Sequence, residues 1–460
     1  MGRLIMVSNR IPTEAEPAGG LVVALHECLT QQGGLWIGSS GEEKQNPESE
    51  LREIGRGAYT RLAYDMTPAE YEDFYLGYAN SVLWPLFHHR ADLIDLQPGY
   101  AEAYMTVNRR VANMIADIAQ PDDAIWIHDY HFLPLARDLR QMGFEGRIGF
   151  FLHIPFPTAA NLPALPEAKE LIEWVGAYDL FGLQTRRDVS ACLEVLRLSG
   201  QAEMLGDGSV KLGDHRVNVA NFPIGIDADS FARLAENSED INIPLSRDTK
   251  LVLGVDRLDY SKGLVNRFEG FNAYIEDRED HMPRATLIQI APPSREDVEA
   301  YRDIRAELER LSGSINGAHA ELDWTPIRYI RRPVDREKLA VLYRRAHVAL
   351  VTPLADGMNL VAKEYVAAQD PDDPGVLVLS HFAGASEQLK DALFVNPYDT
   401  QQMGRVIGKA LTMPLSERIR RHESLLASVR EQDIAWWTDQ FLEQLGRVGS
   451  PGPEAEPVCS

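Results

Sequence analysis

The chain of 460 residues carries 46 basic and 69 acidic side chains, which gives a formal net charge of −23 at pH 7. This charge argues against nucleic acids and anionic membrane surfaces as partners, because both require a basic footprint. A hydrophobic content of 45% and a charged content of 25% are typical of a soluble globular protein, and the length favours two domains.

The three cysteines, Cys28, Cys192 and Cys459, are widely spaced and odd in number, and they form neither a metal-binding nor a disulfide pattern. The opening stretch MGRLIMVSNR has only a short apolar run, which predicts a strand and not a signal peptide. No stretch approaches the roughly 20 apolar residues of a membrane span. We therefore expect a cytoplasmic protein with no membrane partner.

Short β-branched or aromatic runs alternate with helical patterns, and many of these runs are continuously apolar, as in parallel strands covered on both faces. The first series of predicted strands comprises 3–9, 124–130, 147–154, 179–185 and 217–223. The second series comprises 250–258, 285–293, 327–333, 347–354, 375–381 and 392–399. Helical patterns lie at 101–119, 263–277, 296–311, 359–369 and 415–446, the last with a break near Asp433.

The polar segment 225–250 separates the two series of strands and marks a domain boundary. We predict an α/β protein of two doubly wound, Rossmann-like domains, residues 1–225 and 226–429, with the active site in the cleft between them. The Pro-rich, acidic tail at 448–460 is expected to be disordered.

Polar motifs follow the predicted strands at their carboxyl ends, where ligands bind in doubly wound folds. Arg10 follows the first strand, and Arg295 follows a strand of the second series; together they could hold a phosphate group. A buried arginine pair left without its phosphate would reject the unphosphorylated analogue by about 10⁴-fold. The paired glycines Gly19 and Gly20 would let the backbone approach a ligand closely, although a flexible loop explains them equally well.

Histidines and an aspartate follow two neighbouring strands. The stretch WIHDYHFLP at 126–134 contains His128, Asp129 and His131, and His153 follows the next strand. This grouping lacks the further spaced ligands of a zinc site, so we favour hydrogen bonding to sugar hydroxyls over metal binding. A core histidine is an equally good interpretation of His153.

The stretch VDRLDYSKGL at 255–264 places two cations and a glycine between a buried strand and a helix. Arg257 and Lys262 suit the negative charge of a diphosphate leaving group. The alternative is a surface ion pair with Asp256 or Asp259, which would contribute little to stability.

The stretch ADGMNLVAKEYVAAQD at 355–370 is predicted to be a turn that leads into a helix, whose first unpaired N–H groups could bind an anion. Glu364, one turn into the helix, could accept hydrogen bonds from two ribose hydroxyls, whereas we expect Lys363 to point elsewhere. An N-capped core helix with a solvated Lys and Glu is the alternative. The sequence contains no nucleophile elbow and no Walker loop, so these motifs indicate an enzyme whose cleft binds two phosphorylated ligands.

Several long motifs, in this order, resemble the trehalose-6-phosphate synthase family over about residues 3–446. They are SNRIP, AGGL, GGLWIG, LWPLFH, WIHDYHFLP, GFFLHIPFP, RLDYSKGL, TPLADGMNLVAKEYVAAQ and HFAGASEQL. The resemblance implies a retaining glycosyltransferase of the two-Rossmann-domain type, GT-B, whose C-terminal helix, here about 430–447, packs back on the N-terminal domain. Its members move glucose from UDP-glucose, or in some cases GDP-glucose, to glucose 6-phosphate.

The resemblance also implies roles for individual residues. The donor would be bound by Gly19, Gly20, His153, Arg257, Lys262, Val334, Asp356, Asn359, Leu360, Val361, Ala362, Lys363 and Glu364. The acceptor would be bound by Arg10, Ser39, Tyr75, Trp84, Asp129 and Arg295. Of these, Asp129, His153, Arg257, Lys262 and Asp356 would form the catalytic set.

The family is thought to react on one face of the sugar, so that the leaving phosphate oxygen takes the acceptor proton. Such a reaction needs neither a protein nucleophile nor, with Arg257, Lys262 and a helix N-terminus in place, a metal or other cofactor. The resemblance further implies a homo-oligomer, dimer or tetramer, and a separate trehalose-6-phosphate phosphatase that completes an osmoprotective pathway.

Two positions depart from the family pattern. Ser39 stands where a Trp is usual near the acceptor, and Val334 stands where an aromatic often meets the donor base. Ser39 leaves open a glucosylglycerol-phosphate synthase that uses glycerol 3-phosphate, and Val334 leaves open GDP-glucose as donor. A non-catalytic sugar-phosphate sensor is the alternative of a different class.

Overall fold

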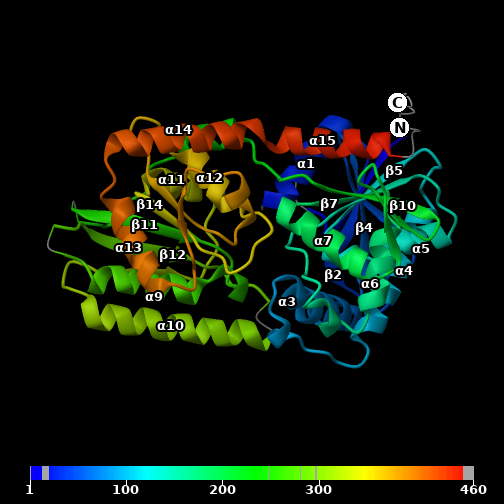
Figure 1. Ribbon diagram of the computed structural model, residues 1–460, viewed down its shortest axis with the longest axis horizontal. Helices are drawn as coiled ribbons and strands as arrows, with labels where there is room; N and C mark the ends of the chain where they lie inside the picture. The colour runs from blue at the N-terminus through cyan, green and yellow to red at the C-terminus, as the bar shows by residue number, and fades with distance from the viewer. Residues whose placement is uncertain (1, 13–19, 247, 280, 296–297, 449–460) are drawn as a thin grey trace, which may run out of the picture.

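The computed structural model describes residues 2–12, 20–246, 248–279, 281–295 and 298–448. Within these residues, two sheets lie side by side, each flanked by helices (Figure 1). The first sheet has the strand order β3-β4-β2-β1-β5-β6-β7-β10-β9-β8. Its strands are β1 (Leu4–Arg10), β2 (Leu35–Glu43), β3 (Arg52–Arg56), β4 (Thr60–Met66), β5 (Ala124–His128), β6 (Arg147–Phe151), β7 (Leu180–Leu183), β8 (Ala202–Met204), β9 (Val210–Leu212) and β10 (His215–Asn221).

The second sheet has the order β13-β12-β11-β14-β15-β16, and all of its pairings are parallel. Its strands are β11 (Thr249–Val255), β12 (Arg284–Ile290), β13 (Ile327–Ile330), β14 (Val348–Val351), β15 (Val376–Ser380) and β16 (Leu393–Val395). The proposed boundary between residues 225 and 226 falls in the connection between the two sheets, and the domain limits remain a prediction.

Helices occupy the segments between the strands. In the first half they are α1 (Gly20–Gln32), α2 (Pro68–Glu70), η1 (Tyr71–Leu83), α3 (Trp84–Phe87), η2 (Ala91–Leu93), α4 (Tyr100–Ala116), η3 (Tyr130–Phe132), α5 (Leu135–Gln141), η4 (Leu162–Ala164), α6 (Ala168–Gly176) and α7 (Arg186–Leu198). In the second half they are α8 (Ala228–Asn237), η5 (Tyr260–Lys262), α9 (Leu264–Glu276), α10 (Glu299–His319), α11 (Arg336–Arg345), α12 (Leu360–Ala368), η6 (Gly384–Glu387), α13 (Thr400–Leu411), α14 (Leu415–Glu431) and α15 (Ile434–Arg447).

Apolar side chains cover both faces of the sheets, as the continuous apolar runs predict. In β1, Ile5 and Val7 enter one core cluster, whereas Leu4 and Met6 enter another, because alternate side chains of a strand point to opposite faces. The predicted α/β class and parallel strands are confirmed.

Most of the predicted strands run two to four residues too far at their carboxyl ends, although β1 ends one residue later than predicted. The stretch predicted at 147–154, for example, leaves the sheet after Phe151, yet Leu152 and Ile154 stay buried in the loop. Because these loop residues are apolar, the sequence pattern predicts a longer strand than the structure has. The prediction also missed β2, β3, β4, β8 and β9, of which β3, β8 and β9 form antiparallel pairs at the two edges of the first sheet.

The helix η1 is a π-helix of 13 residues, which no pattern in the sequence predicts. The side chains of Asn80 and Ser81 donate hydrogen bonds to the carbonyls of Tyr75 and Leu76, five residues earlier, at 2.7 and 2.8 Å. π-Helical turns are rare and often lie at functional sites. This one contains Tyr75 and leads directly into Trp84, two predicted acceptor residues.

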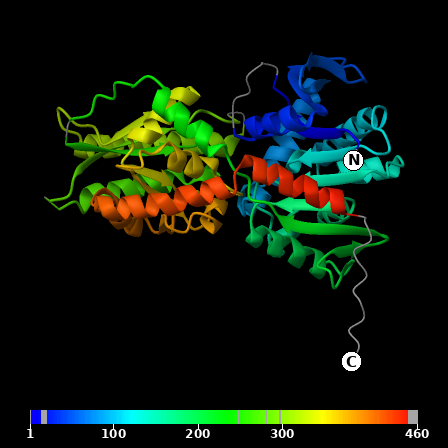
Figure 2. The ribbon, with the colours of Figure 1, turned by 90° about the horizontal axis from the view of Figure 1, so that it is seen from above.

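The C-terminal segment crosses from the second half to the first (Figures 1 and 2). The predicted break near Asp433 is present, and the Asp433 carboxylate caps α15 by accepting a 2.8 Å hydrogen bond from the Trp436 N–H. Beyond it, Phe441 stacks on Trp126 of β5, with ring centroids 4.3 Å apart. α15 is thus built into the core of the first half. No described helix is long and apolar enough to cross a membrane.

Substitution of Phe441 by Ala should lower the free energy of unfolding by about 3–5 kcal/mol, because it removes a fully buried ring and leaves a cavity. Urea unfolding would measure the change. Gln440→Ala, one position away on the exposed face of α15, is the control and should stay within about 0.5 kcal/mol of the unsubstituted protein. Equal losses for both variants would contradict the buried position of Phe441.

Candidate active site

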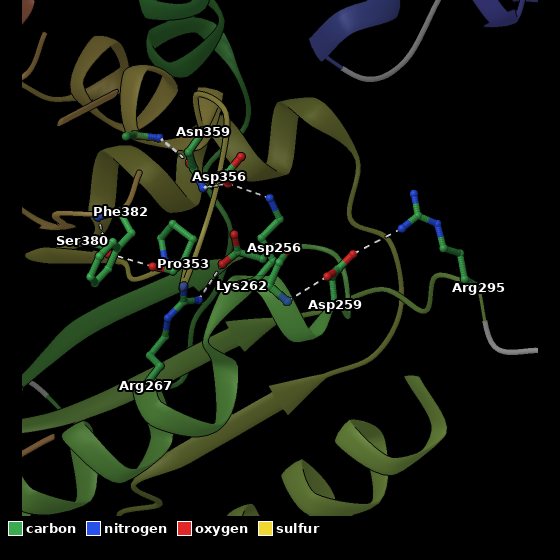
Figure 3. Close-up of polar contacts among 12 residues, drawn as sticks. Asp256, Asp259, Lys262, Arg267, Arg295, Pro353, Asp356, Asn359, Ser380 and Phe382 are labelled. Carbon is green, nitrogen blue, oxygen red and sulfur yellow. Dashed lines mark hydrogen bonds and ion pairs between the residues drawn. The ribbon is translucent and has the colours of Figure 1, made fainter. Parts of the chain in front are cut away.

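Three of the predicted donor residues of the second half, Lys262, Asp356 and Asn359, meet beyond the carboxyl ends of β11 and β14 (Figure 3). The Lys262 ammonium lies 2.6 Å from Asp356 Oδ2, and the Asn359 side-chain amide donates to the same oxygen at 3.0 Å. This pairing was not expected from the sequence. It holds the Asp356 carboxylate between an ammonium and an amide. Arg257 is exposed at the same edge, with its guanidinium carbon 5.9 Å from the centre of the Trp84 ring.

The N-terminus of α12 faces this group. Asn359 has a left-handed backbone, with φ of 82°, and its side-chain oxygen accepts the Ala362 N–H at 3.3 Å. Lys363 points away from the cleft, as predicted: it is fully buried, and its ammonium donates to the Ile224 carbonyl at 2.6 Å. Burial lowers the pKa of Lys363 to about 7.

Glu364 is half-buried one turn into α12, and the Tyr343 hydroxyl lies 3.4 Å from its carboxylate. Burial raises the pKa of the Glu364 carboxyl to about 7, partly offset by the charge of Arg336. Leu360, Val361 and Val334 are half-buried against the apolar cluster beside it.

Arg295 binds residues from both halves of the molecule. Its guanidinium carbon lies 3.8 Å from the centre of the Trp84 ring, and its nitrogens donate to the hydroxyls of Tyr301 at 2.6 Å and Tyr130 at 3.0 Å. The Asp259 carboxylate lies 3.5 Å away. Tyr130 and Tyr301 were missed in the sequence, because a tyrosine in an apolar stretch is indistinguishable from a core residue.

The remaining predicted acceptor residues of the first half lie near one another at the end of β1. Arg10 is exposed, with its guanidinium carbon 5.8 Å from the centre of the Tyr75 ring, which stacks on His131. Ser39 pairs with Arg10 in the sheet register and is fully buried. Its hydroxyl accepts the Gly41 N–H at 3.1 Å.

Asp129 and His153 are adjacent. The Asp129 carboxylate accepts the His153 backbone N–H at 3.2 Å, and the His153 ring lies 3.2 Å from the His128 ring, nitrogen to nitrogen. Burial raises the pKa of Asp129 to about 6 and lowers the pKa of His153 to about 3, so the imidazole is neutral at pH 7. His153 is half-buried beside Asp129, and its role in donor binding stays a prediction.

Strained backbone conformations also occur among the predicted site residues. In the described part of the chain, positive φ occurs at the non-glycine residues His89, Asp129, Arg295 and Asn359. Three of these four are predicted site residues, and strained backbone is concentrated at functional sites because it orients side chains.

The two halves touch at Gly357. A Cβ atom there would lie 2.2 Å from the His153 carbonyl oxygen, so glycine is required for this approach. Of the predicted pair of glycines, Gly20 begins α1 and Gly19 lies outside the described residues. The described residues contain no group of three or more His, Cys, Asp or Glu placed to hold a metal ion.

Similarity to known proteins covers nearly the whole chain. A profile of glycosyltransferase family 20 matches residues 6–447. The chain belongs to glycosyltransferase family 20. A trehalose-6-phosphate synthase of Sodalis glossinidius (strain morsitans) is 44% identical over 456 residues, which cover 98% of this chain and 97% of the relative.

Two solved structures of similar proteins hold ligands. An alpha,alpha-trehalose-phosphate synthase (UDP-forming) from Burkholderia xenovorans, in complex with glucose-6-phosphate, is 43% identical with a TM-score of 0.91, covering 97% of this chain and 100% of that chain. An E. coli structure with bound UDP-2-fluoro glucose is 42% identical with a TM-score of 0.91, covering 97% and 99%. The family resemblance and the GT-B fold are confirmed, and this family 20 protein is a glycosyltransferase.

Glu364 should make stability depend on pH. Its ordinary pKa is 4.5 and its folded pKa is about 7, so the folded state is favoured below pH 4.5 and loses this contribution as the pH rises to 7. Between pH 5 and pH 8, the free energy of unfolding should fall by up to about 3 kcal/mol relative to that of Glu364→Gln. Urea unfolding at several pH values measures this difference, and parallel curves would show that Glu364 titrates normally.

Proposed function

We propose that this family 20 enzyme transfers glucose from UDP-glucose to glucose 6-phosphate with retention of configuration, giving α,α-trehalose 6-phosphate and UDP. The contact between Arg295 and Trp84 carries the proposal. It sets a buried cation of the second half on an aromatic ring of the first half, and the same cation lies 3.5 Å from the Asp259 carboxylate, three residues before Lys262. The ligands of the two solved relatives, a sugar phosphate and a nucleotide-sugar analogue, support the same assignment.

On the donor side, Arg257 and Lys262 would neutralise the diphosphate, and Asp356 and His153 would hold hydroxyls of the donor glucose. Backbone N–H groups from Leu360 to Lys363 and the Glu364 carboxylate would bind uridine and its ribose. On the acceptor side, Arg10 and Arg295 would bind the phosphate, with Tyr75, Trp84 and Asp129 around the sugar. The roles of Gly19, Gly20, Ser39, Val334, Asn359, Val361 and Ala362 remain those of the sequence prediction.

The proposed reaction breaks the bond between the anomeric carbon and the diphosphate oxygen while the acceptor oxygen forms a new bond on the same face. The acceptor proton passes to the leaving diphosphate oxygen, so no protein nucleophile is needed. The carboxylates of Asp356 and Asp129 fit this scheme, because Asp356 is held by Lys262 and Asn359, and Asp129 accepts a backbone N–H. Catalysis then rests on positioning and on positive charge near the leaving group.

We further propose that the reaction needs no metal or other cofactor, that the enzyme forms a homo-oligomer, and that a separate phosphatase acts on its product. Release of UDP from UDP-glucose, or of GDP from GDP-glucose, with EDTA present, tests the first point. Release should require glucose 6-phosphate, with little or none for glucose. Release with glycerol 3-phosphate alone would favour the glucosylglycerol-phosphate reaction, and binding without release would favour the sensor.

Arg295→Met should reduce kcat/KM for glucose 6-phosphate by about 10- to 100-fold, because charge-assisted hydrogen bonds to the phosphate are lost. The affinity for UDP should change less than twofold. Arg302→Met, an exposed arginine on α10, is the matched control and should leave both unchanged. An Arg295→Met variant with normal KM for glucose 6-phosphate would place the phosphate elsewhere.

A further inference from the structure

Arg267, on α9, is fully buried beneath the loops that follow β11 and β14 (Figure 3). Charged side chains are seldom fully buried unless they are paired. The Nη1 of Arg267 donates to Asp256 at 2.7 Å and to the Gln289 side-chain oxygen at 2.9 Å, and its Nε donates to the Thr352 hydroxyl at 3.0 Å. One guanidinium therefore joins three side chains.

These three partners come from three neighbouring strands. Asp256 follows β11, Gln289 belongs to β12 and Thr352 follows β14, and the sheet order places β11 between the other two. The guanidinium is planar and presents its donors in a fixed fork, so its hydrogen bonds restrict the relative positions of the groups that accept them.

The loops held in this way carry the proposed donor-binding side chains. Asp256 immediately precedes Arg257 on one loop, and Thr352 begins the other, which ends at Asp356 and Asn359. The loops are also linked directly: the Leu354 N–H donates to the Ser261 carbonyl at 2.7 Å. Arg267 lies below this link and touches neither Lys262 nor Asp356 in any hydrogen bond or ion pair of the described residues.

A glycine leaves room for the guanidinium. Gly254, in β11, has no side chain at this point, and a Cβ there would lie 2.3 Å from the Gln289 side-chain oxygen and 2.7 Å from Arg267 Nη1. The positive charge of Arg267 is balanced by Asp256 at 2.7 Å, so the pair adds little net field to the cleft. Its influence on the site must therefore be mainly geometric.

We propose that Arg267 is a positioning residue. It fixes the distance between the Arg257–Lys262 loop and the Asp356–Asn359 loop, and so holds the donor-binding side chains in the arrangement that the reaction requires. This inference rests on the proposed function, because that function gives the two loops their roles. It adds a residue that contacts no substrate and acts only through Asp256 and Thr352.

Thr352→Val tests the proposal with little risk to folding, since it removes one hydroxyl and keeps the side-chain shape. The matched control is Thr286→Val, at the opposite end of the same sheet, where an equally buried hydroxyl donates to the Thr325 carbonyl at 3.0 Å. Both variants should lose similar thermal stability. Only Thr352→Val should lose kcat, by about 5-fold, the value of one net hydrogen bond.

Arg267→Lys keeps the charge and loses the fork. Assayed well below its Tm, this variant should have kcat reduced by about 100-fold, the effect of displacing reacting groups by about 1 Å. Its affinity for UDP, measured by calorimetry, should weaken, whereas its affinity for glucose 6-phosphate should stay within twofold. If Arg267 had a purely structural role, Arg267→Lys would lower Tm, but it would not weaken the affinity for UDP more than the affinity for glucose 6-phosphate.

The proposal is overturned if Thr352→Val and Thr286→Val have equal kcat, or if folded Arg267→Lys retains kcat and UDP affinity. Failure of the proposed function gives a different result, namely that the unsubstituted enzyme does not require glucose 6-phosphate. The UDP affinity of Arg267→Lys decides the positioning role in that case too, because nucleotide binding does not depend on which acceptor is used.

Discussion

The ion pair between Lys262 and Asp356 is the contact on which the arrangement of the cleft depends, because it joins two loops that are 94 residues apart in the sequence. Asn359 donates to the same carboxylate and also caps α12, so the direction of that helix is coupled to the ion pair. A partly buried ion pair adds little to the free energy of unfolding, but it favours the one conformation in which its two groups meet. Here the favoured conformation brings the Lys262 ammonium, the Asp356 carboxylate and the N-terminus of α12 together in the cleft.

The contact between the halves extends this arrangement to the first sheet. Glu387, in η6, accepts the backbone N–H groups of Arg186 and Arg187 at 2.9 and 3.2 Å, so a carboxylate of the second half caps α7 of the first. A carboxylate at a helix N-terminus is favoured by the helix dipole. Together with the approach of Gly357 to His153, this cap fixes how the donor loops face the acceptor residues.

The sequence predicted those features of the fold and the site that depend on residue types close together in the chain. The apolar runs located most of the parallel strands, though not β2 and β4. The polar motifs after them predicted residues that the structure brings together, since the carboxyl ends of parallel strands share one edge. The expectation that Lys363 points elsewhere was correct, although its partner, the Ile224 carbonyl, is 139 residues away and could not be named.

The parts that the sequence could not supply depend on contacts between distant segments. Arg267 occupies a helix position where arginine is usually solvated, and only the strand order shows that it reaches three strands. Tyr130 and Tyr301 meet on Arg295 because of how the two halves pack. The π-helix that carries Tyr75 depends on Asn80, whose side-chain oxygen accepts the Tyr130 hydroxyl at 2.8 Å, a tertiary contact that no local pattern encodes.

The position of α15 has a consequence for biosynthesis. The ribosome releases a chain from its N-terminus, and N-terminal domains commonly fold first. In this protein the first half lacks Trp437 and Phe441 until α15 has been synthesised, so the Trp126 face of its sheet stays uncovered while both sheets are being made. The half that is made first is therefore completed last, and its uncovered aromatic face is the surface on which a nascent chain would aggregate or engage a chaperone.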